Sequence, residues 1–121
     1  MDRIIPWLES NIPAGDETSI VHGDFRIDNM IFHPSEPRIL AVLDWELSTL
    51  GNPLADFAYH AMMYHMPPHI VAGLAGADLH EFHIPSESEY VRSYCERTNR
   101  TSVPNYKFYS AFKPAKLCFY R

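Results

Sequence analysis

Cysteine is scarce in this sequence, which contains only Cys95 and Cys118 among its 121 residues. Their spacing matches neither a metal-binding nor a redox motif, which argues against a disulfide framework and favours a reducing compartment such as the cytoplasm. Long apolar runs are also missing, since no stretch approaches the roughly 18 residues of a membrane-spanning helix. The opening Met1-Asp2-Arg3 is unlike a signal peptide. We therefore expect no membrane association.

Clusters of positive charge are absent as well. The chain has 10 Lys and Arg residues against 15 Asp and Glu residues, and it contains no basic run. This balance argues against a nucleic-acid or anionic-membrane partner. Apolar residues make up 46 % of the sequence, without repeats or low-complexity tracts. We interpret residues 1–121 as a single domain or part of one.

Two short apolar runs predict an antiparallel hairpin. Residues 30–32 and 39–43 are rich in strand-forming side chains, and residues 33–38 between them contain two prolines and a serine, which are typical of a turn. If the turn is centred between Glu36 and Pro37, Asn29 lies directly opposite Asp44. Opposed residues have Cα atoms roughly 4.5 to 5.5 Å apart.

An amide oxygen and a carboxylate at that distance can bind one cation. Magnesium prefers a few hard oxygen ligands together with water and nucleotide phosphates, so Asn29 and Asp44 suit magnesium better than a softer metal. The hairpin therefore predicts a magnesium site at its open end.

The loop that enters this hairpin carries the candidate catalytic side chains. Asp24 follows a strand-like run, residues 18–21, so its carboxylate is expected near the metal pair, where it can accept the proton of an attacking hydroxyl. Arg26 is placed to offset the charge of a transferred phosphoryl group. We expect His22 and Gly23 to shape the loop, His22 through hydrogen bonds and Gly23 through close backbone approach or an unusual dihedral angle.

Residues 22–29 and 43–58 together resemble the aminoglycoside phosphotransferase (APH) and choline kinase group of protein-kinase-like enzymes. Within that group the chain is most similar to the branch related to kinase domains fused to acyl-CoA dehydrogenases. The resemblance extends from about Ile4 to about Phe112. It implies an α+β fold, the mostly helical C-terminal lobe of a kinase, in which a small antiparallel hairpin carries the active site.

The resemblance also implies roles for individual residues. Asp24 would be the catalytic base, and Asn29 and Asp44 would be the magnesium ligands. Asp56 would be a buried strut that accepts hydrogen bonds from the backbone near His22, although its place in the first turn of a helix is also typical of a surface carboxylate. The donor would be ATP or GTP, and the acceptor a hydroxyl of a small molecule, for this branch a hydroxy acid or hydroxyacyl-CoA.

A complete enzyme of this group also has an N-terminal lobe with a phosphate-covering loop and a strand Lys. The sequence shows neither, so we expect residues 1–121 to be a partial domain, the central part of the C-terminal lobe, with little activity alone. An acyl-CoA dehydrogenase domain or subunit is an expected partner. In a eukaryote, a mitochondrial or peroxisomal location is the alternative to the cytoplasm.

Helical periodicity and caps predict the surrounding elements. A helix ending at Ser10 is expected to pack under the catalytic loop, and Asn52-Pro53 opens a second helix that ends before Pro67. Residues 69–83 predict a loop with a short helix. Residues 86–89 form a capping box at the start of a third helix.

The last predicted helix begins near Asn105 and buries Tyr109 and Phe112. Pro114 predicts a kink or an early end. Earlier in the chain, Trp45-Glu46 follows the metal Asp without the glycine of the protein-kinase segment, which predicts a fixed loop. Glu46 is open to two roles, assisting a second magnesium ion or bonding backbone.

Two alternatives to phosphotransfer remain open at this point. One is a pseudokinase module that binds nucleotide or substrate without catalysis. The other is a zinc hydrolase, although the chain offers no cysteine near its histidines and two of them at helical spacing do not make a structural site. The histidines concerned are His60, His65, His69, His80 and His83.

Overall fold

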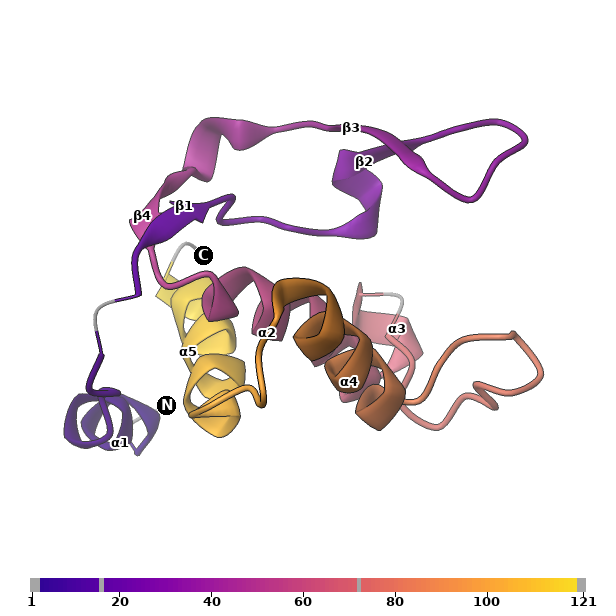
Figure 1. Cartoon of the computed structure of the whole chain (residues 1–121). Coiled ribbons are helices and arrows are strands. Elements are labelled where there is room, and N and C mark those ends of the chain that lie inside the picture. Colours follow the sequence, from indigo (N-terminus) through magenta and orange to yellow (C-terminus); the bar gives the residue numbers. More distant parts are fainter. Residues whose placement is uncertain (1–2, 16, 72, 120–121) are drawn as a thin grey trace.

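The computed structural model describes residues 3–15, 17–71 and 73–119 and shows a helical layer beneath a layer of short strands (Figure 1). The strands come between α1 and the other helices in the chain, an α+β arrangement as expected for part of a kinase-like C-terminal lobe. The helices are α1 (Ile4–Ser10), α2 (Leu54–Ala61), α3 (Pro68–Val71), α4 (Glu87–Thr98) and α5 (Tyr106–Phe119).

Helix α2 lies at the centre of the helical layer and carries five buried residues. Leu54 and Ala58 are 1 % and 0 % exposed, and Tyr109 from α5 completes the cluster that they form. On a neighbouring face of α2, Phe57 stacks on Tyr94 of α4 with ring centroids 4.0 Å apart. The position of α2 is therefore fixed by packing on two sides.

The predicted helix starts are confirmed by their caps. The side-chain oxygen of Asn52 accepts a hydrogen bond from the Leu54 N–H at 2.9 Å. At the start of α4, the Glu89 N–H donates to Ser86 Oγ, and the Ser86 N–H donates to Glu89 Oε2 at 2.8 Å, so both halves of the capping box form. Helix α2 ends at Ala61, and not just before Pro67 as predicted, and a 3-10 helix, Met62–Tyr64, follows it directly. The rest of the segment before α4 contains α3 and otherwise irregular backbone, as expected.

The strands form two antiparallel pairs. The predicted hairpin is present as β2 (Met30–Phe32) and β3 (Ile39–Val42). The predicted strand before the catalytic loop is β1 (Ser19–Val21), and it pairs with β4 (Thr49–Gly51). The sequence did not predict β4. In the sequence, β1 precedes the hairpin and β4 follows it. Their pairing brings residues 49–51 beside the start of the catalytic loop (Figure 1).

The register predicted for the hairpin is wrong by one residue. Leu43, and not Asp44, lies opposite Asn29 and donates its N–H to the Asn29 carbonyl at 2.8 Å. The physical reason is the turn, in which the His33 N–H bonds the Arg38 carbonyl at 2.9 Å, so that the turn is centred one residue earlier than predicted. This shift of the turn alone would move the pairing by two residues. An irregularity between Ile31 and Phe32 restores one of them, which leaves the observed error of one residue.

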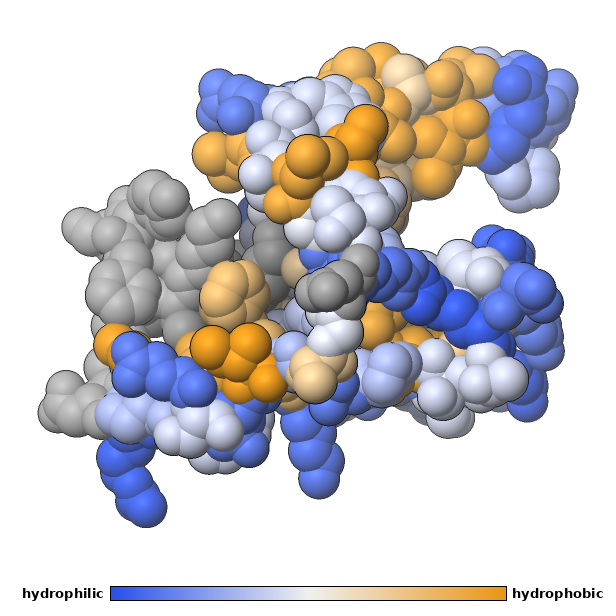
Figure 2. Space-filling view, turned by 60° about the vertical axis from the view of Figure 1, so that its left-hand side comes forward, coloured by the Kyte–Doolittle hydropathy of each residue, from blue (hydrophilic) through white to orange (hydrophobic). Residues whose placement is uncertain are grey.

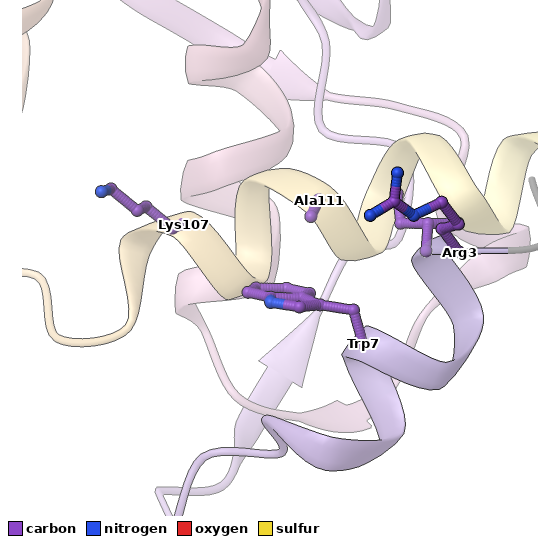
Figure 3. A pocket seen from close by; sticks show the side chains of 5 residues that line it. Arg3, Trp7, Lys107 and Ala111 are labelled. Atoms are coloured by element: carbon purple, nitrogen blue, oxygen red, sulfur yellow. The ribbon is translucent and has the colours of Figure 1, made fainter.

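Helix α1 packs against α5 and not under the catalytic loop, which corrects the sequence-based expectation. The ring of Trp7 lies 6.4 Å from that of Phe108. An open depression between the two helices is lined by Arg3, Ile4, Trp7, Lys107 and Ala111 (Figure 3). The β2–β3 hairpin lies at the opposite end of the molecule (Figure 1). The depression is therefore separate from the candidate catalytic residues.

Helix α5 is longer than predicted. It continues through Pro114 to Phe119, because a proline removes one backbone hydrogen bond while the remaining turns keep theirs. Tyr109 is buried as expected, but Phe112 is 39 % exposed, which corrects its predicted burial. Among the described residues, neither α5 nor any other helix has the length and hydrophobicity to cross a membrane.

Candidate active site

The catalytic loop begins with a glycine that no other residue can replace without strain. Gly23 has φ +89°, a left-handed conformation that residues with a Cβ rarely adopt. A Cβ built on it would lie 2.4 Å from the carbonyl oxygen of Leu47. Both predicted reasons for the glycine, close approach and an unusual dihedral angle, are present.

His22 joins the catalytic loop to the end of β3. Its side chain is buried, and its Nε2 donates to the Leu43 carbonyl at 2.7 Å, while its Nδ1 accepts the Asp24 N–H at 3.2 Å. The partners fix one neutral tautomer, because a carbonyl only accepts and a backbone N–H only donates. Trp45 covers the ring at a centroid distance of 4.6 Å. His22 thus sets the spacing between Asp24 and the strand that leads to Asp44.

Asp56 connects the catalytic loop to the helical layer. Its two carboxylate oxygens accept the backbone N–H groups of His22 at 2.6 Å and Gly23 at 3.0 Å. These are charge-assisted hydrogen bonds, which are stronger than neutral ones. The contacts are those of the strut that the family resemblance implies, and the first turn of α2 provides its position.

The carboxylate of Asp24 is held by donors on both of its oxygens. Tyr59 Oη donates to Oδ1 at 2.8 Å, and Asn29 Nδ2 donates to Oδ2 at 3.1 Å. The side chain remains 26 % exposed. A carboxylate has about four lone-pair positions, so these two bonds leave acceptor capacity for an incoming hydroxyl.

Arg26 lies beside this carboxylate. Its Nε is 3.7 Å from Asp24 Oδ1, and its Nη2 bonds Asp28. Partial burial works against the charged guanidinium, but Asp24 and Asp28 outweigh that effect, so the pKa of Arg26 is raised. The structure therefore places Arg26 with the candidate base, paired to acidic side chains.

The Asn29 amide is oriented by its hydrogen bonds. Its nitrogen donates to the backbone carbonyl of Asp24 at 2.9 Å as well as to the carboxylate. With the nitrogen turned to these acceptors, the amide oxygen points away from Asp24. This oxygen is the atom of an asparagine that a magnesium ion would take.

Asp44 follows β3 in the left-handed conformation, with φ 64° and ψ 54°. Such strain in a residue other than glycine is concentrated at functional sites. The next residues form a 3-10 helix, Trp45–Leu47, and Trp45 Nε1 donates to the Val42 carbonyl at 2.8 Å. The exposed Asp44 carboxylate and the Asn29 amide oxygen are ligand types that magnesium takes, and the magnesium site itself stays a prediction. The role of Glu46 stays a prediction.

Tyr59 is the site residue that sequence reasoning missed. It is 5 % exposed, and burial, together with its hydrogen bond to Asp24, raises its pKa to about 12. One signal was available, because Tyr59 lies three residues after Asp56 and therefore on the same face of α2.

The histidines do not form a metal centre. His60 Nδ1 lies 2.7 Å from Tyr90 Oη, and His65 Nε2 lies 2.9 Å from Glu87 Oε1, so each has a different neighbour. Over the part of the chain that the structure describes, no three His, Cys, Asp or Glu side chains come together as a metal ion would require. The zinc hydrolase alternative finds no support in this arrangement.

Several known proteins are similar to this chain in sequence, and one solved structure is also similar in fold. Acyl-CoA dehydrogenase family member 10 of Mus musculus is 46 % identical over 114 residues, which cover 93 % of this chain and 11 % of that protein. Acyl-CoA dehydrogenase family member 11 of Gallus gallus is 45 % identical over 122 residues, covering 97 % of this chain and 16 % of that protein. The chain thus spans less than a fifth of the length of these relatives.

A solved structure is also similar to this chain, both in sequence and in fold. A crystal structure from Ralstonia eutropha JMP134, of a protein named after the aminoglycoside phosphotransferases, matches with a TM-score of 0.87 and 51 % identity. The match covers 93 % of this chain and 35 % of that one. The model of the phosphotransferase enzyme family, APH, matches residues 1–90, which include every candidate site residue named above. The chain belongs to this phosphotransferase family.

Proposed function

We propose that the domain to which this chain contributes transfers the terminal phosphoryl group of ATP or GTP to a hydroxyl of a small molecule. The observation that carries the proposal is the Asp24 carboxylate, which is partly exposed and held on both oxygens by Tyr59 and Asn29. A general base needs this combination of access and fixed orientation. Membership of the phosphotransferase family supports the reaction class.

In the proposed reaction Asp24 accepts the proton of the acceptor hydroxyl while the hydroxyl oxygen bonds to the terminal phosphorus. The bond from that phosphorus to the bridging oxygen breaks, and the nucleoside diphosphate leaves with the electron pair. Asn29 and Asp44 would hold magnesium, which supplies positive charge to the phosphate oxygens when bound. Arg26 would leave its ion pair with Asp28 and bind the transferred phosphoryl group instead, since an ion pair at the surface is weak.

We propose a hydroxy acid or a hydroxyacyl-CoA as the acceptor. Two of the relatives are named as acyl-CoA dehydrogenase family members, and each is much longer than this chain. An acyl-CoA dehydrogenase domain or subunit is the corresponding partner. A kinase acting on such hydroxylated compounds would work on molecules chemically close to the substrates named for those relatives.

We also propose that the nucleotide-covering lobe lies outside residues 1–121 and that these residues alone have little activity. The share of the solved structure that they cover, 35 %, supports this division. The test compares the turnover of magnesium-ATP by the 121-residue chain with that by a complete domain containing it. Equal turnover of magnesium-ATP by both would contradict the division.

The catalytic assignment is tested in the complete domain with Asp24→Ala. We expect transfer to fall by about 10²- to 10⁴-fold, the usual contribution of a general base, while calorimetry shows magnesium-ATP binding within about twofold of the wild type. Asp78→Ala is the matched control, because Asp78 is an exposed carboxylate whose hydrogen bonds lie within its own loop. The assay offers hydroxy acids, hydroxyacyl-CoA compounds and other hydroxylated metabolites and detects phosphorylated products.

Two outcomes would contradict the proposal. Unchanged transfer in Asp24→Ala would remove Asp24 from the base role. Tight magnesium-ATP binding with no phosphorylated product from any acceptor would favour a pseudokinase module instead.

A further inference from the structure

The side chain that orients the candidate base comes from helix α2 and not from the catalytic loop. Tyr59 Oη donates to Asp24 Oδ1 at 2.8 Å, across 35 positions of sequence. The Tyr59 side chain is itself buried, at 5 % exposure. Its hydroxyl group reaches the partly exposed carboxylate from the interior side of the site.

The helix that carries Tyr59 is held by core packing and by hydrogen bonds to the catalytic loop. Leu54 and Ala58, on the same helix, are the most deeply buried residues of the core cluster with Tyr109. Asp56, one turn before Tyr59, holds the backbone N–H groups at the start of the catalytic loop. One face of α2 thus anchors the backbone of the loop through Asp56 and its reactive side chain through Tyr59.

The chemistry of the tyrosine suits orientation and not proton transfer. With a pKa of about 12, caused by burial and by the bond to Asp24, the phenol stays protonated at neutral pH and acts as a donor. A donor on Oδ1 and the Asn29 amide on Oδ2 restrict rotation of the carboxylate. Arg26 lies against both side chains, so the arrangement includes a positive charge as well.

We propose that Tyr59 is a positioning residue for the phosphotransfer reaction, which holds the Asp24 carboxylate in the orientation that accepts the proton of the acceptor hydroxyl. The proposal rests on the proposed function for its kinetic consequence, but the orientation itself is a property of the chain. Misplacement of a reacting group by about 1 Å is enough to slow a reaction about 100-fold. Loss of the phenol hydroxyl should therefore slow the chemical step and leave nucleotide binding alone.

The kinetic test uses Tyr59→Phe in the complete protein, since phenylalanine keeps the buried ring and removes the hydroxyl. We expect kcat to fall about 10- to 100-fold, as for loss of a hydrogen bond to a charged group, with KM for magnesium-ATP within about twofold. In an Asp24→Ala background the same change should have no further effect, because no carboxylate remains to be oriented. Tyr64→Phe is the control, because its hydroxyl donates to the Pro85 carbonyl at 2.8 Å, outside the site.

The structural test is independent of activity. Three-bond couplings of the Asp24 side chain, measured by NMR on the labelled protein, should report one χ1 rotamer in the wild type and averaged rotamers in Tyr59→Phe. A single unchanged rotamer in the variant would overturn the proposal, and so would an equal loss of kcat in the Asp24→Ala background. If Asp24→Ala itself leaves turnover unchanged, the proposed function fails, while the couplings still decide whether Tyr59 orients the carboxylate.

Discussion

Apart from Val21, the apolar residues that are buried among those described belong to the helical layer, whereas the β layer leaves most of its own at the surface. In the hairpin, Ile31, Phe32, Ile39 and Leu40 are 44 % to 49 % exposed. Figure 2 shows the resulting hydrophobic surface over the upper layer. Elsewhere in the β layer, Val21 and His22 are buried, and His22 is polar.

This difference indicates that polar contacts hold the β layer in place. His22 bonds the end of β3, Asp56 bonds the loop backbone, and Asn29 bonds Asp24. The helical layer, in contrast, gains its stability from burial of apolar area, at roughly 25 cal/mol per Å². The groups that carry the proposed chemistry are therefore also the groups that fix the geometry of their layer.

The contrast is tested most strongly by removing one apolar side chain from each layer. Leu54→Ala should lower the free energy of unfolding by about 4 kcal/mol, because it leaves a cavity in the core. Ile31→Ala should cost about 1 kcal/mol or less, since nearly half of that side chain is exposed. Urea unfolding measures both, and similar losses would contradict the division between the layers.

The next largest effect is expected at the catalytic-loop glycine. Gly23→Ala should destabilise the protein by roughly 3 kcal/mol, since the new Cβ adds a clash with Leu47 to the left-handed backbone strain. Gly76→Ala is the matched control, because Gly76 also has a positive φ, of 81°, but has open space around it. It should cost about 1 kcal/mol, and thermal unfolding compares the two.

Breaking the contact between the layers should have a smaller effect. Asp56→Asn replaces the carboxylate that accepts the N–H groups of His22 and Gly23 with a neutral amide. The free energy of unfolding should fall by about 2 kcal/mol. Hydrogen exchange of those two amides should accelerate. Asp78→Asn provides the comparison, because Asp78 accepts the N–H groups of His80 and Glu81 within an exposed loop. Equal effects of the two variants would show that the link is no stronger than a surface turn.

Acid should weaken the helical layer through His60. Burial lowers the pKa of His60 below its value of about 6.5 in an unfolded chain. The unfolded chain therefore takes up a proton first as pH falls, and the contribution of His60 to stability is present above pH 6.5 and is lost below it. His60→Gln should reduce the drop in stability between pH 7.5 and pH 5.5, measured by urea unfolding. His80→Gln, at an exposed position, should leave the drop in stability unchanged. A smaller drop in His80→Gln and an unchanged drop in His60→Gln would contradict the role of His60.

The smallest effect is expected for the ion pair between Glu17 and Arg100. Arg100 Nη1 lies 2.8 Å from Glu17 Oε2 and ties the segment before β1 to the end of α4. The Glu17 carboxylate is 44 % exposed, so Glu17→Gln should cost about 0.5 kcal/mol or less. A double-mutant cycle with Arg100→Gln gives the coupling, and a value well above 1 kcal/mol would mean that a surface contact also holds the β layer.

The sequence predicted the elements whose signals are local. The cap at Asn52 and the capping box at Ser86 identified α2 and α4 correctly, and the hairpin was recognised from its two runs and its turn. Gly23 was identified from its type and place. These features depend on residues that are near one another in the chain.

The features that the sequence did not predict depend on contacts over long separations. Strand β4 has only three residues, and its partner β1 lies about 30 positions earlier. The register of Asn29 is the exception, because it follows from a local turn, residues 33–38, whose centre the sequence did not determine. Tyr59 has the ordinary pattern of a core aromatic residue, and only the folded chain brings its hydroxyl group to Asp24.

The left-handed backbone of Asp44 determines which variants are informative at that position. Asparagine and aspartate tolerate this conformation, whereas alanine adopts it at a cost of roughly 1 to 2 kcal/mol. An alanine scan would therefore mix the loss of a charge with a rearrangement of the main chain that joins β3 to the Trp45 segment. The isosteric exchange Asp44→Asn separates the two, so it is the substitution that reports on the carboxylate alone.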